Sequence, residues 1–192
     1  VARQGNKRTM TPQIHDTLNL KGIPYQIVGV NGYGLPFPED FGMTAMMMSA
    51  ACYRGYVCTY TVAEDTLRLT NLIVRAMGGK YLPVGGVQPQ MNREFNNGQY
   101  HNLGLHVLFR GKLLVGSGLI REMAVQVGFQ KPVAYEQVVE LVFDYGALKA
   151  CTDFSGWYAR MREAVAPQRQ PREDLLSGWA RHPFSLDYEV EL

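Results

Sequence analysis

The sequence lacks most of the features that identify a chemistry from residues alone. Its three cysteines, Cys52, Cys58 and Cys151, are an odd number and include no C-x-x-C pair, so neither a disulfide framework nor a thiolate metal site is indicated. The longest apolar-looking stretch, 43–53, is short and rich in Ser, Thr and Ala, so no membrane span is predicted. No charged segment followed by an apolar run opens the chain. We therefore expect a cytoplasmic protein.

An excess of charge of one sign is also missing. The 192 residues carry 19 basic and 17 acidic side chains, a net charge of +2. A dedicated nucleic-acid binder usually has a stronger positive field, so we rank nucleic acid last among possible partners, although the basic segment 1–9 and the aromatic residues motivate it. The apolar content of 46% excludes a disordered chain and is sufficient for one sizeable core.

Signatures of metal or cofactor binding are absent from the sequence. Its histidines form no H-x-H or H-x-x-x-H pattern and have no carboxylate at ligand spacing. His101 and His106 are five residues apart on one predicted strand, which places them on opposite faces. The glycine-rich segment 29–34 does not match G-x-G-x-x-G, and 116–118 does not match G-x-S-x-G. We expect no metal and no cofactor.

What the sequence does contain is a weak internal repeat. Residues 18–22 match 107–111 in the order apolar, any, apolar, basic, glycine, at a separation of 89 residues (111 − 22). Residues 58–67 match 139–148 at a separation of 81 residues (148 − 67). Self-similarity of this kind predicts two copies of a unit that bury their apolar faces against each other. We place the copies at about 15–75 and 102–153.

Alternating polarity and turn residues predict two hairpins in each copy. The first copy has strands over 16–20 and 25–30, then over 53–62 and 66–74. The second copy has strands over 102–109 and 112–118 with a turn at Arg110-Gly111, then over 135–143 and 147–152. Residues 76–100, which are rich in Gly, Pro, Asn and Gln, are interpreted as a linker rather than as packed structure. A helix is predicted to begin at 153–156 and to end at Pro167.

Eight strands in two equivalent halves predict a mainly β fold. We expect a pseudo-twofold antiparallel barrel or sandwich, built from two repeats of two hairpins, with a C-terminal helix. Closure removes sheet edges, which favours the barrel. The predicted organisation is a mobile leader at 1–9, a single β domain at 10–166 and a tail at 167–192. The tail either docks on its own chain or is exchanged with a neighbour, so a homo-oligomer such as a homodimer is possible.

The first functional hypothesis is a non-enzymatic binding or interaction protein. Many aromatic residues look exposed, whereas titratable residues are not clustered. Three consecutive methionines, 46–48, offer adaptable thioethers for varied apolar partners, or they fill gaps in the core. We predict that a small apolar ligand or a protein partner contacts Tyr33, Tyr53, Met47 and Tyr60.

The second hypothesis is a small-molecule enzyme of lyase, isomerase or hydrolase type with its site inside the barrel. Its candidate catalytic residues are Glu140, Glu122, Arg121 and His106. Glu140 is an acid in an otherwise apolar strand; inside the barrel, desolvation would raise its pKa. The alternative interpretation places Glu140 on the solvated face, paired with a Lys or Arg across the strand. Cys52, with Arg54 nearby, has no histidine close in sequence and is interpreted as a small buried hydrophobe.

Overall fold

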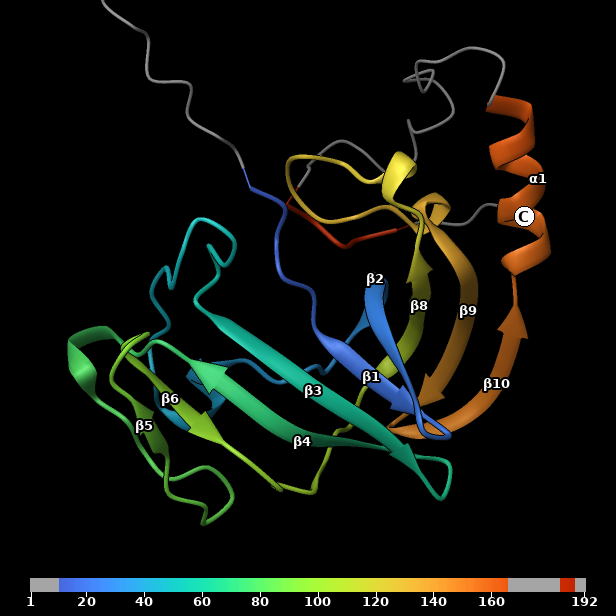
Figure 1. Cartoon of the computed structure of the whole chain (residues 1–192). Helices are drawn as coiled ribbons and strands as arrows, with labels where there is room; N and C mark the ends of the chain where they lie inside the picture. Colours follow the sequence, from blue (N-terminus) through green and yellow to red (C-terminus); the bar gives the residue numbers. More distant parts are fainter. Residues whose placement is uncertain (1–10, 166–183, 189–192) are drawn as a thin grey trace, which may run out of the picture.

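The computed structural model describes residues 11–165 and 184–188, so the predicted leader and most of the predicted tail lie outside the described residues. Within the described residues the chain is mainly β, with one α-helix (Figure 1). The strands are β1 (Thr17–Leu20), β2 (Ile23–Tyr33), β3 (Tyr56–Ala63), β4 (Thr66–Val74), β5 (Gln90–Asn92), β6 (Asn97–Tyr100), β7 (Leu105–His106), β8 (Arg110–Leu119), β9 (Tyr135–Asp144) and β10 (Ala147–Asp153). The helices are the 3₁₀ turns η1 (Pro38–Phe41), η2 (Met77–Gly79), η3 (Arg121–Met123) and η4 (Pro132–Ala134) and the α-helix α1 (Ser155–Val165).

Seven of these strands close into a barrel. Their order is β10-β9-β8-β2-β1-β3-β4, and the pair Ala147↔Thr66 joins β10 back to β4. All neighbours are antiparallel except β1 and β3, which run parallel. The prediction of a barrel is therefore confirmed, whereas the predicted number of eight strands is wrong.

Three of the four predicted hairpins form, each around a two-residue turn. They connect β1 to β2, β3 to β4 and β9 to β10. Both central residues of each turn have positive φ, which is the type I′ geometry that matches the twist of paired strands. The pairs of turn residues are Lys21 and Gly22, Glu64 and Asp65, and Tyr145 and Gly146. Turn residues and alternating polarity therefore predicted these hairpins correctly.

The fourth predicted hairpin does not form. Arg110 and Gly111 are not a turn but the first residues of β8, which pairs with β2 on one side and β9 on the other. The segment before them contributes only the two-residue strand β7, which pairs with β4. Two hairpins, β3–β4 and β9–β10, thus occupy equivalent places in the two proposed copies, but the pseudo-twofold architecture of two repeats is not confirmed.

The predicted linker at 76–100 is partly folded. It contains β5 and β6, which form a hairpin that extends the sheet beyond β4. Tyr100, the last residue of β6, and Val84, in the segment before β5, are fully buried. The interpretation of the whole segment as unpacked was wrong, because strands at the margin of a sheet need few apolar residues of their own.

Apolar side chains that point inward fill the barrel. Val139, Leu141 and Phe143 alternate along β9 toward this interior, and they join a single packed cluster with residues of the other strands. Its largest fully buried members are Tyr60, Tyr100, Phe109, Phe143, Leu18, Ile27, Met43, Leu67, Leu69, Leu72 and Leu113. A barrel of this size has an interior that side chains can fill.

A second apolar cluster lies outside the barrel, where α1 packs on β9. It contains Tyr158 of α1, Tyr188 of the tail and Val138 of β9. Trp157 of the same helix is 43% exposed. No helix in the described part of the chain is long and apolar enough to span a bilayer.

The described part of the tail, 184–188, docks on its own chain. The Val30 N–H donates to Leu186 O at 2.7 Å, and the Tyr188 N–H donates to Val30 O at 3.3 Å. Tyr188 is buried in the outer cluster. The tail therefore covers the outside of β2 in the same molecule.

Candidate functional site

The connection from β2 to β3, residues 34–55, brings a buried polar cluster and an exposed apolar surface together at one end of the barrel. Its first part contains the 3₁₀ turn η1, which begins with Pro38 and ends at Gly42 in the left-handed conformation. Met43 is buried in the barrel cluster and receives a hydrogen bond on its sulfur from the Tyr100 hydroxyl at 3.3 Å. The rest of the connection passes over the point where β1 and β3 begin.

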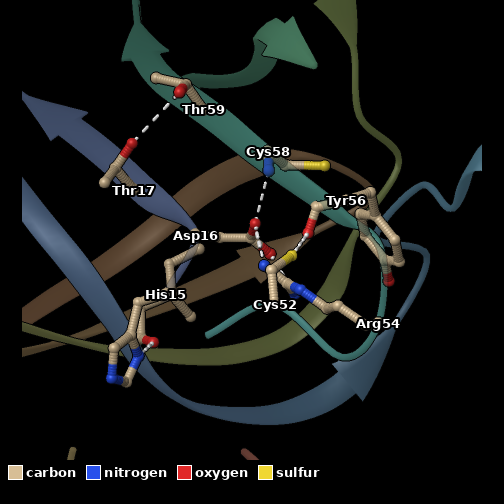
Figure 2. Close-up of polar contacts among 9 residues, drawn as sticks. His15, Asp16, Thr17, Cys52, Arg54, Tyr56, Cys58 and Thr59 are labelled. Atoms are coloured by element: carbon tan, nitrogen blue, oxygen red, sulfur yellow. Dashed lines mark hydrogen bonds and ion pairs between the residues drawn. The ribbon is translucent and has the colours of Figure 1, made fainter. Parts of the chain in front are cut away.

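An ion pair between Asp16 and Arg54 fixes this connection (Figure 2). The Arg54 Nη1 donates to Asp16 Oδ2 at 2.8 Å, and Nη2 donates to Oδ1 at 2.5 Å. The Cys58 N–H also donates to Oδ1, at 2.5 Å. Asp16 directly precedes β1 and Arg54 lies just before β3; because the two strands are parallel neighbours with Thr17 opposite Thr59, Asp16 lies beside Cys58 near the start of β3. The carboxylate therefore ties the starts of two strands that are far apart in sequence.

Aromatic rings cover the guanidinium of Arg54. Its Cζ lies 4.7 Å from the ring centroid of Tyr56 and 5.9 Å from that of Phe129. A guanidinium stacks favourably on aromatic faces in this way. Burial, more than any other effect, raises the pKa of the Tyr56 hydroxyl, so this ring stays neutral beside the ion pair.

His15 completes the cluster as a neutral side chain. The Gln130 N–H donates to Nε2 at 2.9 Å, and Nδ1 lies 2.7 Å from Ile27 O. Since Nε2 accepts a hydrogen bond, Nδ1 must carry the ring proton and donate a hydrogen bond to the carbonyl. Desolvation by burial lowers the His15 pKa to about 4, with Arg54 contributing in the same direction. Both ring nitrogens are occupied, so the side chain is a connector between segments rather than a proton donor.

The two thiols beside the ion pair are not activated. The Cys52 Sγ donates to Tyr56 O at 3.5 Å. Burial raises the pKa of Cys52 despite the opposing effect of Arg54, and burial also raises the pKa of Cys58. A nucleophilic cysteine needs a lowered pKa, so the interpretation of Cys52 as a small buried hydrophobe fits this geometry.

The same connection and the adjacent turn η2 expose a group of large apolar side chains. We call this group the Met-aromatic surface; it consists of Phe37, Met46, Met47, Tyr53 and Met77, which are 37–58% exposed. Met46 and Met77 lie on adjacent segments, because the Met46 N–H donates to Arg75 O and the Met77 N–H to Thr44 O. Phe37 packs edge-on against Tyr56, and Tyr53 against Phe184 of the tail.

Side chains from other segments fasten the backbone beneath this surface. The Gln13 amide donates to Ala50 O at 2.9 Å and accepts from the Tyr53 N–H at 3.0 Å. The Arg75 Nη1 donates to Met47 O at 3.2 Å. The exposed thioethers can therefore change rotamer while the main chain that carries them stays in place.

The structure does not bring the four predicted catalytic residues together. Arg121 and Glu122 are exposed on η3, near the end of β8. His106 is exposed on β7, where it pairs with Arg68 of β4. Glu140 lies on the outer face of β9, away from the barrel interior. Apart from the sequence neighbours Arg121 and Glu122, no two of these four residues lie on the same element.

Glu140 has polar partners of its own on the outer face. Its carboxylate lies 3.2 Å from Lys112 Nζ and accepts a hydrogen bond from the Tyr188 hydroxyl at 3.2 Å. The prediction of an outward-facing Glu140 paired with a basic residue across the strand matches this arrangement. The expectation that this face is solvated was wrong, because the docked tail leaves Glu140 only 6% exposed.

The four predicted ligand-binding residues fall in three places. Tyr53 and Met47 belong to the Met-aromatic surface. Tyr60 is 1% exposed and packs in the barrel interior. Tyr33, 62% exposed, is the last residue of β2, where it pairs with Arg110 at the start of β8; it directly precedes the connection but is not part of the Met-aromatic surface.

Sequence reasoning missed the members of the buried cluster, Asp16, Arg54 and His15. Asp16 was read only as the first residue of an alternating strand, and Arg54 only as a neighbour of Cys52. An acid at the start of one strand and an arginine just before another do not by themselves predict an ion pair. They would do so only if the parallel pairing of the two strands were known. Within the described residues, no three or more His, Cys, Asp or Glu side chains gather as potential metal ligands.

Comparison with known proteins gives no relative: no family model, curated protein or solved structure matches the chain.

Proposed function

We propose that this protein is a non-enzymatic interaction protein that binds an apolar segment of a protein partner through the Met-aromatic surface. The observation that carries the proposal is the combination at one barrel end of five exposed large apolar side chains and a main chain fastened by buried polar contacts. Aromatic residues and methionine are enriched at protein interfaces. Clustered apolar exposure of this kind is a mark of interaction sites.

The chemistry of the surface favours a peptide segment over one rigid small molecule. Three of its five side chains are methionines, whose flexible thioethers repack around partners of different shape. Tyr53 and Phe37 add the flat aromatic area that anchors binding energy at interfaces. A small apolar ligand is the alternative occupant of the same surface.

The alternative of a small-molecule enzyme receives no support from the geometry of its candidates. Catalysis inside the barrel would need at least two of the four candidate residues within hydrogen-bond reach, and the interior is lined instead by the packed apolar cluster. A cytoplasmic setting remains part of the proposal, based on cysteine usage in the sequence.

A matched pair of tyrosine variants tests the proposal. Partners captured by the intact protein would be identified and purified, and their binding measured by calorimetry against Tyr53→Ala, Met47→Ala and Tyr33→Ala. Tyr53→Ala and Met47→Ala should each weaken binding about fivefold or more, because truncating a central contact costs more than about 1 kcal/mol. Tyr33→Ala should weaken binding less than either, since Tyr33 lies outside the Met-aromatic surface.

The outcome of this comparison is decisive in both directions. Loss of binding only with Tyr33→Ala would move the contact to the place where Tyr33 pairs with Arg110. Equal binding by all three variants would exclude both surfaces. Circular dichroism of each variant shows whether the fold is intact.

A further inference from the structure

The described part of the tail pairs with β2 as a short parallel strand. On the side away from β8, the neighbour of β2 is β1 up to Gln26, and the Ile27 N–H then donates to Asp16 O, just before β1. At Val30 the tail takes this place. The bridge Val30↔Asp187 is parallel, and Val30 bonds to both neighbours of Asp187 through its N–H and its C=O. Without the tail, these two groups would form an open sheet edge, which is a template for another strand.

Tyr188 of the tail fills a pocket that suits a phenol. Its ring is 3% exposed and packs in the outer cluster. The hydroxyl donates to one carboxylate oxygen of Glu140 at 3.2 Å, and Lys112 Nζ lies 3.2 Å from the other. Gly29 makes room for the ring, because a Cβ there would lie 2.6 Å from it. A phenylalanine would leave the carboxylate without the hydroxyl donor, and a phosphotyrosine would bring a second negative charge against Glu140.

The first described residue of the tail segment touches the Met-aromatic surface. The rings of Phe184 and Tyr53 meet edge-on, with their centroids 5.3 Å apart. They remain 43% and 47% exposed, so the contact covers only part of either ring. Leu186, between Phe184 and Tyr188, packs against the barrel cluster. The segment 184–188 therefore has apolar contacts at its first, third and fifth residues, and it connects the Met-aromatic surface to the edge of β2.

These contacts also suit an extended segment of another protein. When a peptide adds to a sheet edge, main-chain hydrogen bonds supply affinity and side-chain pockets supply specificity. Here Val30 offers the main-chain groups, and the pocket of Tyr188 offers the specificity. A partner segment that covers Tyr53 would also occupy the space of Phe184. The tail is part of the same chain, so it competes with such a segment at a high effective concentration.

We propose that the docked tail is the resident ligand of a strand-acceptor site, formed by the edge of β2 at Val30, the pocket beside Glu140 and the ring of Tyr53, and that the partner segment displaces it. This inference rests on the proposed function and specifies the chemistry of the partner. The partner segment is extended and parallel to β2. It carries an aromatic residue against Tyr53, an apolar residue two positions later and a tyrosine four positions later. By occupying the site, the tail lowers the affinity for this partner.

The first test uses the tail sequence itself as the probe and needs no partner. A fluorescein-labelled peptide with the sequence of residues 182–192 contains the whole docked segment. Full-length Tyr188→Ala lacks the largest anchor of its own tail, so it should bind the peptide and raise its fluorescence anisotropy. The intact protein should bind the peptide about tenfold more weakly or less, because its own tail occupies the site. Phe184→Ala, which keeps the outer cluster complete, should bind the peptide with an intermediate affinity.

Matched controls define the pocket in the protein and in the peptide. Adding Gly29→Ala to Tyr188→Ala should weaken peptide binding about fivefold or more, because the new Cβ overlaps the tyrosine ring of the peptide. Adding Gly156→Ala instead should leave binding unchanged, since a Cβ there would meet only Arg160 at 3.7 Å. A peptide with phenylalanine in place of its tyrosine should bind about tenfold more weakly, and a phosphotyrosine peptide should not bind.

The second test measures competition between the tail and the partner captured by the intact protein. Phe184→Ala and Tyr188→Ala should each raise the affinity for this partner several-fold, because both weaken the docking of the tail. Tyr53→Ala should lower the affinity. An excess of the tail peptide should displace the partner from Tyr188→Ala, and the phosphotyrosine peptide should not.

The acceptor site and the proposed function fail in different ways. The acceptor site is overturned if the peptide binds neither Tyr188→Ala nor Phe184→Ala, both with intact circular dichroism spectra, or if Gly29→Ala has no effect on its binding. A partner whose affinity falls in Phe184→Ala would overturn the competition and make the tail a part of the binding surface. Partner binding that is insensitive to Tyr53→Ala and Met47→Ala would overturn the proposed function, whereas peptide binding to Tyr188→Ala would still support the site on β2.

Discussion

At the scale of single residues, the sequence indicated which residues are polar but not which polar residues are buried. Asp16 and Arg54 are separated by 38 positions, and no local pattern connects them. Only the parallel pairing of β1 with β3 brings them together, and a pairing between distant strands is not encoded in the periodicity of either one. The same limit applies to Glu140, whose burial depends on Tyr188, 48 positions later.

The Asp16–Arg54 pair should stabilise the fold far more than an exposed pair of the same chemistry. The two side chains are 7% and 24% exposed, whereas those of Asp144 and Arg110 are 50% and 53% exposed. Breaking a buried pair leaves an uncompensated charge and costs about 3–5 kcal/mol; an exposed pair contributes about 0–1 kcal/mol. We expect Asp16→Asn to lower the free energy of urea unfolding by about 3 kcal/mol or more, and Asp144→Asn by less than about 1 kcal/mol.

The Asp144→Asn variant controls for the substitution itself, because it makes the same chemical change opposite another arginine. Similar losses in the two variants would mean that burial does not strengthen the Asp16 contact. A loss for Asp16→Asn that is accompanied by a changed denaturant slope would indicate a different unfolded or native state rather than a lost ion pair.

At the scale of elements, the local sequence predicted the type of each segment, strand or turn, more accurately than it predicted the strand's pairing partners. Turn residues located the hairpins at 21–22 and 145–146 correctly, since type I′ geometry depends on a few adjacent residues. Arg110-Gly111 resembles those turns in sequence, yet β8 continues through it because β2 and β9 supply partners on both sides. The competition between a local turn and two long strand pairings was decided by contacts distant in sequence.

Docking of the tail on β2 depends on the absence of a side chain at Gly29. A Cβ at this position would lie 2.6 Å from the Tyr188 ring and 3.1 Å from Leu114 Cβ. We expect Gly29→Ala to displace Tyr188 and to lower stability by about 1–3 kcal/mol, the usual cost of overpacking. Hydrogen exchange at the Tyr188 N–H, which donates to Val30 O, should then become much faster.

Gly156→Ala is the matched control for the tail. Gly156 lies in α1, and an added Cβ there would meet only Arg160 at 3.7 Å, so alanine should leave exchange at Tyr188 unchanged and raise helix stability slightly. Unchanged exchange at Tyr188 in Gly29→Ala would show that the ring adapts and that Gly29 is not required for docking.

At the scale of the whole molecule, the barrel could be predicted but its strand count could not. Many short alternating strands favour closure, because closure removes exposed edges. Two equal halves would give an even number of strands, but the barrel closes with seven. In the order of strands, β2 lies between β8 and β1. An odd number cannot be divided between two equivalent copies, so the sequence similarity of 18–22 to 107–111 has no counterpart in strand pairing.

Closure itself depends on Gly146, where three distant segments meet. The Gly146 N–H donates to Phe109 O and its carbonyl accepts from the Leu67 N–H, each at 2.8 Å. Its φ is +85°, and a Cβ would collide with Val107 O and approach His106 Nε2. We expect Gly146→Ala to lower the free energy of unfolding by about 1–2 kcal/mol for the left-handed backbone and by about 1–3 kcal/mol more for the collision.

Gly78→Ala isolates the backbone contribution, because Gly78 also has positive φ, +64°, but an added Cβ would meet nothing within 4 Å. Urea unfolding of both variants, followed by tryptophan fluorescence and by circular dichroism, should show the larger loss in Gly146→Ala. Since the joint links β4, β10 and the segment before β8, the two probes should still report one shared transition at a lower midpoint. Equal losses in the two variants would mean that the joint tolerates the added methyl group, and separate transitions for the two probes would mean that the barrel does not unfold as one unit.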